Sequence, residues 1–239
     1  MKLLLILLII YVYLTYSQKE DFTNNKTIWM YWEQGEENLK NEYNKKCIKQ
    51  WRNLHPTWNV RVLNYDQALE LIPDLKKTNH LKVQHRSDYL RLALLEKYGG
   101  VWVDASVYPL MKLDDWLESE LQHNNIFMYK YEPVSKGRIT SNWFIAVSNS
   151  KNAVIKKWKK KFEENMPKKN EKYPYYMTHN LLLELYNSDT EVKFHIDNLR
   201  YTEDKSHKGE KDAHMWKRQI KKVNEIDTNL FFFRGNIIG

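Results

Sequence analysis

The chain has 239 residues, of which 42% are hydrophobic and 28% are charged, and its formal net charge is +8. This length suits one α/β domain with a full core and leaves little room for two catalytic domains, and the composition excludes a largely disordered chain. The single cysteine, Cys47, excludes intramolecular disulfides. The basic charge comes with no zinc-finger spacing and no recognisable nucleic-acid module, so we expect no nucleic-acid partner. The lysine-rich run at 156–161 is interpreted as a solvated helix face.

The first part of the chain is typical of a targeting segment. Residues 3–14 are uncharged and apolar after Met1 and Lys2, which predicts a signal peptide or signal anchor over residues 1–17. The run is shorter than the roughly 20 residues of a comfortable membrane helix, but no Ala-x-Ala-like cleavage site follows, which favours an anchor; a buried strand is the other alternative. Residues 18–26 are polar and are interpreted as a stem, and Asn25 opens a glycosylation sequon.

These features predict how the protein is placed in the cell. We expect membrane association through the N-terminus, in the secretory pathway or on a Golgi-like lumenal face if the source is eukaryotic or viral, and otherwise at the cell envelope. Residues 27–239 are expected to form a single domain.

The apolar pattern of the body predicts strands and helices in alternation. In chain order, the sequence predicts strands at 27–32, 58–65, 101–108, 126–131 and 143–147, and helices at 41–54, 66–72, 86–98, 114–121, 152–164 and 175–186. Asp66 is expected to cap the helix at 66–72, and Cys47 to be a small core residue. Two further strands are predicted in the tail, at 192–196 and 229–233. The alternation predicts an α/β fold with a mostly parallel central sheet and helices on both faces.

Three charged residues stand out in the middle of the chain. Asp88 and Arg91 share one face of a predicted helix that is otherwise apolar, and charged groups are costly to bury unless they are paired or functional. Asp104 lies late in an apolar strand, at the edge where ligands of open α/β sheets bind. The alternative is purely structural: a buried pair between Asp88 and Arg91, with Asp104 capping the next turn.

A family resemblance rests on these residues. The pattern Ser87-Asp88-x-x-Arg91, followed by Gly99-Gly100-x-x-x-Asp104-x-Ser106, resembles the sugar-binding region of family 32-type and capsular-polysaccharide-synthesis glycosyltransferases. A similar pattern occurs in the large clostridial glucosylating toxins. Segments 28–35, 51–58 and 141–146 resemble the same enzymes, so the likeness spans about residues 28–186.

The resemblance implies a GT-A-like nucleotide-binding α/β sandwich and an enzyme. Its expected reaction moves a hexose from a nucleotide-diphosphate sugar to a glycan, polysaccharide or lipid-linked acceptor, with retention of anomeric configuration. Trp32 would stack on the donor base, Asn64 and Asp66 would read the base or ribose edge, and Asp88 and Arg91 would hold the sugar. Asp104 would be the first acid of the Asp-x-Asp motif. The other expected donor-binding residues are Ser87, Gly99, Gly100 and Asn142.

One departure from the family pattern concerns the metal. Ser106 stands where many relatives carry the second Asp, the usual ligand of Mn²⁺ or Mg²⁺, although the capsular branch often has Asp-Ala-Thr here. Hard cations prefer carboxylates and phosphates, so the expected metal set is Asp104, Ser106 and a histidine, with His179 preferred over His207 and His214. Two alternatives remain open: an inactive nucleotide-sugar-binding protein on the same fold, and a basic membrane-surface module.

Overall fold

The structure is a computed structural model that describes residue 6 and residues 26–135, 138–200 and 215–217. At its centre lies a five-stranded sheet in the order β2-β1-β3-β8-β5. The strands are β1 (Thr27–Tyr31), β2 (Asn59–Leu63), β3 (Gly100–Val103), β5 (Ile126–Phe127) and β8 (Phe144–Val147). Strand β1 is parallel to β2 and β3, whereas β8 is antiparallel to both of its neighbours. The α/β class with a mostly parallel sheet is therefore confirmed.

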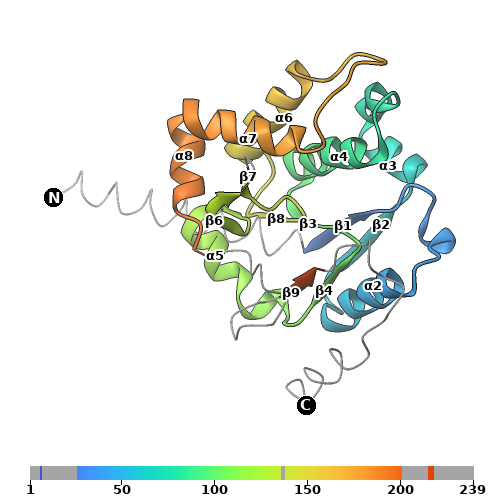
Figure 1. The fold of residues 1–239 in the computed structure, drawn as a ribbon. Helices are drawn as coiled ribbons and strands as arrows, with labels where there is room; N and C mark the ends of the chain where they lie inside the picture. The colour runs from blue at the N-terminus through green and yellow to red at the C-terminus, as the bar shows by residue number, and fades with distance from the viewer. Residues whose placement is uncertain (1–5, 7–25, 136–137, 201–214, 218–239) are drawn as a thin grey trace.

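Helices cover both faces of this sheet (Figure 1). Trp29 and Trp102 point toward one face and Ile28 and Val101 toward the other, because side chains alternate along a strand. The first face packs against α3 (Tyr65–Leu71), α4 (Val83–Tyr98), α6 (Ala153–Glu164), α7 (Met177–Ser188) and α8 (Thr190–Asp197). The second packs against α2 (Glu42–Leu54) and α5 (Leu117–Asn124). The result is a three-layer sandwich with two hydrophobic cores.

Smaller elements complete the part of the chain that the structure describes. Strand β4 (Val107–Pro109) pairs with β9 (Met215–Lys217), and β6 (Lys130–Ser135) pairs with β7 (Arg138–Thr140), both antiparallel. Short 3₁₀ helices lie at Glu36–Asn38, Pro73–Thr78 and Leu113–Asp115.

Most element boundaries agree with the sequence pattern to within a few residues, but the predicted strand at 101–108 is wrong. The chain leaves the central sheet after Val103 and turns, with the backbone N–H of Val107 donating to the Asp104 carbonyl at 3.0 Å. Strand β4 then joins a different sheet. The predicted helix at 114–121 and strand at 126–131 are likewise each divided, into a 3₁₀ turn plus α5 and into β5 plus β6.

Two further predictions need correction. Residues 192–196 belong to helix α8, not to a strand, because Asp189 caps the helix by accepting from two backbone N–H groups, and Val192 and Ile196 bury one face four residues apart. Helix α3 is capped by Asn64 rather than Asp66: the Asn64 side chain accepts from the N–H of Gln67, whose side chain bonds back to Asn64.

Several predictions fall outside the described residues: the strand at 229–233, His207, His214, the stem up to residue 25 and, except for residue 6, the N-terminal tract. Within the part that is described, no helix is both long and apolar enough to cross a bilayer.

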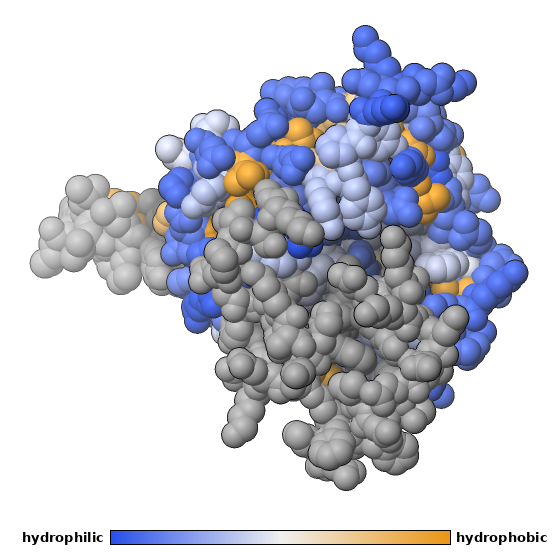
Figure 2. All heavy atoms as spheres, viewed as in Figure 1, coloured by the Kyte–Doolittle hydropathy of each residue, from blue (hydrophilic) through white to orange (hydrophobic). Residues whose placement is uncertain are grey.

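The surface of the described residues is mainly hydrophilic on the side drawn in Figure 2. The lysine-rich run forms part of α6, which buries Trp158 and Phe162 and turns its lysines outward. Lys157 pairs with Asp189 and Glu191 at 2.7 Å. The run is therefore an amphipathic helix whose charge is partly neutralised by neighbouring acids. Cys47 is fully buried, as expected.

Candidate functional site

Three candidate residues lie where parallel strands end. Trp32 directly follows β1, Asn64 directly follows β2 and Asp104 directly follows β3. These strands are adjacent and parallel, so their carboxyl ends meet at one edge of the sheet. That edge is where open α/β sheets bind ligands.

The guanidinium of Arg91 lies between two carboxylates. Its Nη2 is 3.2 Å from Asp88 Oδ1 and 3.4 Å from Asp104 Oδ1. Asp88 and Arg91 are only 7% and 4% exposed. Helix α4 supplies both residues three positions apart, and the end of β3 supplies Asp104. The structure thus brings Asp88, Arg91 and Asp104, the three charged residues singled out in the sequence, into one cluster.

Hydrogen bonds from distant segments fix the buried Asp88. Asn142 Nδ2 donates to Asp88 Oδ1 at 3.1 Å, and Thr178 Oγ1 donates to Asp88 Oδ2 at 2.7 Å. Arg91 Nη1 in turn donates to the backbone carbonyl of Asn142 at 2.6 Å. A buried carboxylate with donors on both oxygens is held in one orientation. Thr178 was missed by the sequence reasoning, because a threonine on an amphipathic helix carries no signal of its partner.

Asp104 is the part of the cluster most open to solvent. Its side chain is 26% exposed, against 5% for Arg91. Trp102 Nε1 donates to Asp104 Oδ1 at 3.1 Å, and the Arg91 guanidinium lies 5.1 Å from the centre of the Trp102 ring. Trp102, also missed as a site residue, therefore orients the carboxylate and packs against the cation behind it.

The remaining residues of the motif are placed differently. Ser87 lies beside the cluster, with Oγ 3.5 Å from Arg91 Nη2, and Ser106 is buried at 4% exposure. Gly99 and Gly100 lie at the amino end of β3, and Asp104 follows its carboxyl end, so the structure does not bring the glycines to the site. Both glycines have positive φ, and a Cβ on Gly100 would come within 2.7 Å of the Thr27 carbonyl oxygen. The positive φ explains a glycine at both positions, and close packing of β3 against β1 is a second reason at Gly100.

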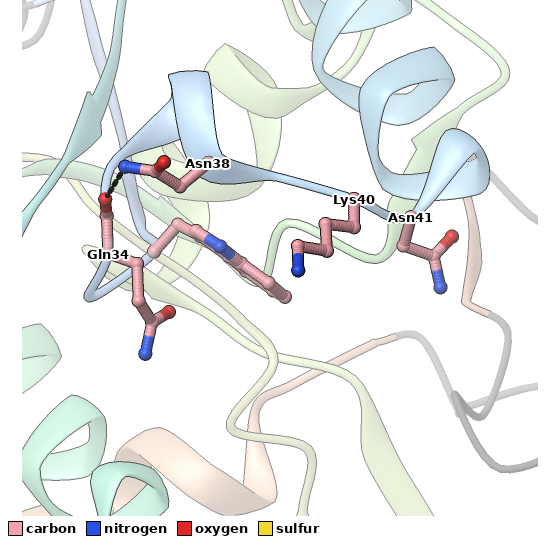
Figure 3. A pocket seen from close by; sticks show the side chains of 5 residues that line it. Gln34, Asn38, Lys40 and Asn41 are labelled. Carbon is pink, nitrogen blue, oxygen red and sulfur yellow. Dashed lines mark hydrogen bonds between the residues drawn. The ribbon is translucent and has the colours of Figure 1, made fainter.

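Trp32 lines a hollow at the same sheet edge. The hollow has a volume of ≈ 570 Å³, and its other lining residues are Gln34, Asn38, Lys40 and Asn41. Figure 3 shows the Lys40 amine and the Gln34 amide extending into this space. An aromatic ring surrounded by amides and an amine suits a planar heterocycle with donor and acceptor groups at its edge.

Asn64 and Asp66, the two residues predicted to contact the base or ribose edge, lie outside the hollow beside Trp32. The Asn64 side chain is used in capping α3, with Oδ1 accepting from the N–H of Gln67 at 2.9 Å. Asp66 is exposed in the first turn of that helix. Neither lines the hollow beside Trp32.

The described residues offer little to hold a resident metal ion. No three His, Cys, Asp or Glu side chains among them lie close enough to form a metal site. Asp104 Oδ1 already faces Arg91 and Trp102, and the His179 ring packs edge-on against Tyr176 at 5.7 Å. Asp104 can supply one carboxylate ligand, and any further hard oxygen ligands would have to come from a bound diphosphate or water.

A protein-family match covers nearly the whole length of the chain. The family model described as capsular polysaccharide synthesis protein matches residues 9–231. The chain belongs to this family. Membership of the capsular polysaccharide synthesis family agrees with the resemblance found at the Asp88 and Asp104 motifs.

Curated relatives of this family member are glycosyltransferases by name. The chain is similar to the glycosyltransferase afumC of Aspergillus fumigatus, at 31% identity over 38% of this chain and 27% of the relative. It is also similar to the O-glycosyltransferase braB of Annulohypoxylon truncatum, at 27% identity over 59% of this chain and 38% of the relative. The chain thus spans well under half the length of these relatives.

Solved structures that resemble this chain are also named as glycosyltransferases. One is the PaToxG glycosyltransferase, at 15% identity and a TM-score of 0.46, covering 77% of this chain and 80% of that one. Another is galactosyltransferase LgtC in complex with donor and acceptor sugar analogs, at 13% identity and a TM-score of 0.42, covering 88% and 95%. The family assignment rests on the family match and not on these two structures.

Proposed function

We propose that this chain is a glycosyltransferase that moves a hexose from a nucleotide-diphosphate sugar to a glycan, polysaccharide or lipid-linked acceptor with retention of anomeric configuration. The observation that carries the proposal is the cluster of Asp88, Arg91 and Asp104 at the carboxyl edge of the sheet. Family membership and the names of the curated relatives support the same reaction class.

The hollow and the charged cluster give the two halves of such a donor separate places to bind. The hollow beside Trp32 would take the base by stacking, and the sugar would lie near Asp104 and Arg91. Asp88, held by Asn142 and Thr178, provides a fixed acceptor for sugar hydroxyl groups. Such positioning of rigid polar groups lowers the barrier to transfer because little reorganisation is needed during the reaction.

The chemistry requires neutralisation of a leaving diphosphate. In the proposed reaction the bond between the anomeric carbon and the diphosphate oxygen breaks, and a bond to the acceptor oxygen forms on the same face of the sugar. The acceptor's hydroxyl proton passes to the departing diphosphate oxygen, so no separate base is required. Arg91 holds the sugar in place and Asp104 contacts the ribose, the sugar or a metal ion. A Mn²⁺ or Mg²⁺ ion bound mainly by the diphosphate would add charge neutralisation there.

Turnover on nucleotide sugars tests the proposal. The full chain is incubated with uridine, guanosine, cytidine and thymidine diphosphate sugars, with and without Mn²⁺, and release of the nucleoside diphosphate is measured. We expect release with at least one donor, and stimulation by Mn²⁺. Tight binding of a nucleotide sugar without any turnover would instead support the alternative, an inactive nucleotide-sugar-binding protein, which the serine at position 106 favours.

We also propose that the N-terminal tract associates the protein with a membrane. The support is the uncharged run at residues 3–14. Cells expressing the full chain and a version lacking residues 1–17 are fractionated, and the full chain is expected in the membrane fraction. Equal solubility of both, without cleavage or glycosylation at Asn25, would overturn this proposal.

A further inference from the structure

An aromatic segment leads into helix α7 beside the candidate sugar site. It runs Tyr173-Pro174-Tyr175-Tyr176. Thr178, three residues after Tyr175, donates its hydroxyl to Asp88 at 2.7 Å. Helix α7, which the segment leads into, is therefore bonded directly to a carboxylate of the site.

The start of helix α4 holds this segment from the other side. The backbone N–H of Lys82 donates to the Tyr173 hydroxyl at 3.0 Å, and the His85 ring meets the Tyr173 ring edge-on with centroids 4.7 Å apart. His85 Nε2 also lies 3.3 Å from the Pro174 carbonyl oxygen. These contacts, together with the φ that Pro174 fixes for itself, hold the segment in place before any ligand binds, which reduces the entropic cost of binding.

Tyr175 is the exposed member of this rigid segment. It is 66% exposed, whereas Tyr173 and Tyr176 are partly buried and His85 is buried. Its ring lies 6.3 Å from the His85 ring and 5.0 Å from the Tyr176 ring. Tyr175 contacts His85, which lies three residues before Asp88 on helix α4, and it precedes by three residues Thr178, which donates to Asp88. Tyr175 therefore lies beside the charged cluster. Burial, followed by the nearby Asp88, Tyr176 and Asp104, raises the pKa of the Tyr175 hydroxyl.

A charged side chain, Arg138, lies against the ring of Tyr176, which neighbours Tyr175. The Arg138 guanidinium lies 4.9 Å from the centre of the Tyr176 ring and 4.8 Å from that of Tyr131. A sugar presents apolar C–H groups on one face and hydroxyl groups around its edge, so it needs an aromatic surface with charged or polar groups nearby. A purely apolar acceptor would be better served by a continuous hydrophobic patch.

We propose that Tyr175 is the stacking platform for a sugar ring of the acceptor, which makes the acceptor a carbohydrate. This inference rests on the proposed glycosyltransferase function and assigns the acceptor side of the same site. The ring of Tyr175 packs against the acceptor sugar and holds its hydroxyl group toward the donor sugar at Asp88 and Asp104.

The test uses the full chain as wild type, Tyr175→Ala, Tyr175→Phe and Phe194→Ala. Phe194 is a matched control because it is 61% exposed and lies on α8, which supplies none of the site residues. Tyrosine ring resonances are followed by NMR while methyl glucoside, methyl galactoside, maltose and lactose are titrated, and uridine and guanosine diphosphates are titrated separately. Transfer to the same four sugars gives the acceptor KM.

We expect at least one of the sugars to shift the Tyr175 resonance and to serve as acceptor. Tyr175→Ala should raise the acceptor KM by about fivefold to tenfold, as loss of an aromatic contact of this kind does, while Tyr175→Phe and Phe194→Ala should resemble wild type. If the nucleoside diphosphates bind and none of the sugars shifts Tyr175, the platform is overturned and the proposed function stands. Equal acceptor KM values for Tyr175→Ala and Phe194→Ala also overturn it. Failure of both nucleotides and every nucleotide sugar to bind overturns the proposed function itself.

Discussion

Arg91 Nη2 lies 3.4 Å from Asp104 Oδ1, and the cation of this pair is buried behind the anion. The two residues come from α4 and from the end of β3. Because the Asp104 side chain is five times more exposed than that of Arg91, at 26% against 5%, a ligand entering from solvent meets the carboxylate first. Arg91 therefore acts on a ligand partly through the carboxylates that it holds.

Replacing Asp104 by Asn tests this carboxylate. The change removes a negative charge and keeps the shape, so we expect transfer activity to fall by about a hundredfold or more, with little loss of stability because the side chain is partly exposed. Initial rates and the thermal unfolding midpoint are measured for Asp104→Asn and for Asp115→Asn, an exposed control outside the cluster. Full activity in Asp104→Asn would show that Asp104 is not part of the catalytic centre.

Replacing Arg91 separates its stabilising role from its role in transfer. Arg91→Met leaves the buried Asp88 without its cation, and breaking a buried ion pair costs about 3–5 kcal/mol of unfolding free energy. Arg91→Lys keeps the charge but cannot reproduce the planar fork that reaches Asp88, Asp104 and the Asn142 carbonyl. We expect this second variant to be more stable than the first and still strongly impaired in transfer. Urea unfolding and initial rates check both, and a stable, active Arg91→Met would contradict the arrangement.

Trp32 is expected to hold the donor base. Stacking of a base on an aromatic side chain is worth about 1–3 kcal/mol, so Trp32→Ala should weaken nucleoside diphosphate binding by about tenfold or more. Trp32→Tyr keeps an aromatic face and should retain most of the affinity. Calorimetry with the nucleoside diphosphate measures both variants. Unchanged affinity in a folded Trp32→Ala would limit this residue to its packing against the core.

Gly100 is expected to matter for stability and not for ligand contact. A Cβ at this position would approach the Thr27 carbonyl oxygen to 2.7 Å, at a φ of +85°. Gly100→Ala should therefore lower the unfolding free energy by about 1–3 kcal/mol, while nucleoside diphosphate affinity in the folded fraction stays near that of wild type. Denaturant unfolding and calorimetry distinguish these effects. A Gly100→Ala variant that is stable but no longer binds nucleotide would instead indicate that Gly100 contributes to donor binding.

His55 is expected to make stability depend on pH. Its Nε2 accepts from the Leu113 N–H at 2.9 Å and its Nδ1 faces the Trp51 carbonyl at 2.9 Å, an arrangement that requires the neutral ring. Burial lowers the pKa of His55 from its ordinary value of 6.5. The unfolded chain therefore takes up a proton at a higher pH than the native protein does, and the unfolding free energy should decline as the pH falls below about 6.5.

Replacing His55 with Gln is the matching control. Gln can keep part of the hydrogen bonding but does not titrate, so the variant should be less stable at pH 7.5 and should lose less stability between pH 7 and pH 5. Thermal midpoints across this range check the difference. Identical pH profiles for wild type and His55→Gln would contradict the assignment.

Local pattern was sufficient to predict the class of the fold and the three charged residues of the cluster. Asp88 and Arg91 interrupt an apolar helix face, and Asp104 follows an apolar strand, so each is unusual in its immediate context. The break after Val103 was missed because the apolar residues continue past Asp104 into a different sheet. The segment 192–196 is short and partly β-branched or aromatic, which suits a strand. The Asp189 cap and the contacts of α8 with α6 and α7 stabilise it as a helix instead.

Partners across long sequence separations could not be predicted in this way. Asn142 was expected to contact the donor, but its bonds to Asp88 and Arg91 depend on where β8 joins the sheet. Thr178 and Trp102 carried no separate signal, because a hydroxyl or an indole on a buried face is common in any core. Gly99 and Gly100 did carry a signal, but the reason for it is backbone conformation at the start of β3.

The hydrogen bond from Thr178 to Asp88 joins residues that are 90 positions apart. A nascent or truncated chain ending before residue 178 would contain helix α4, strand β3 and every charged member of the cluster, and yet Asp88 would lack one of the donors that fix its orientation. The order of synthesis thus delays completion of the site until the helices that cover it have emerged. A donor sugar would accordingly bind in its final geometry only to a chain whose C-terminal helices had docked.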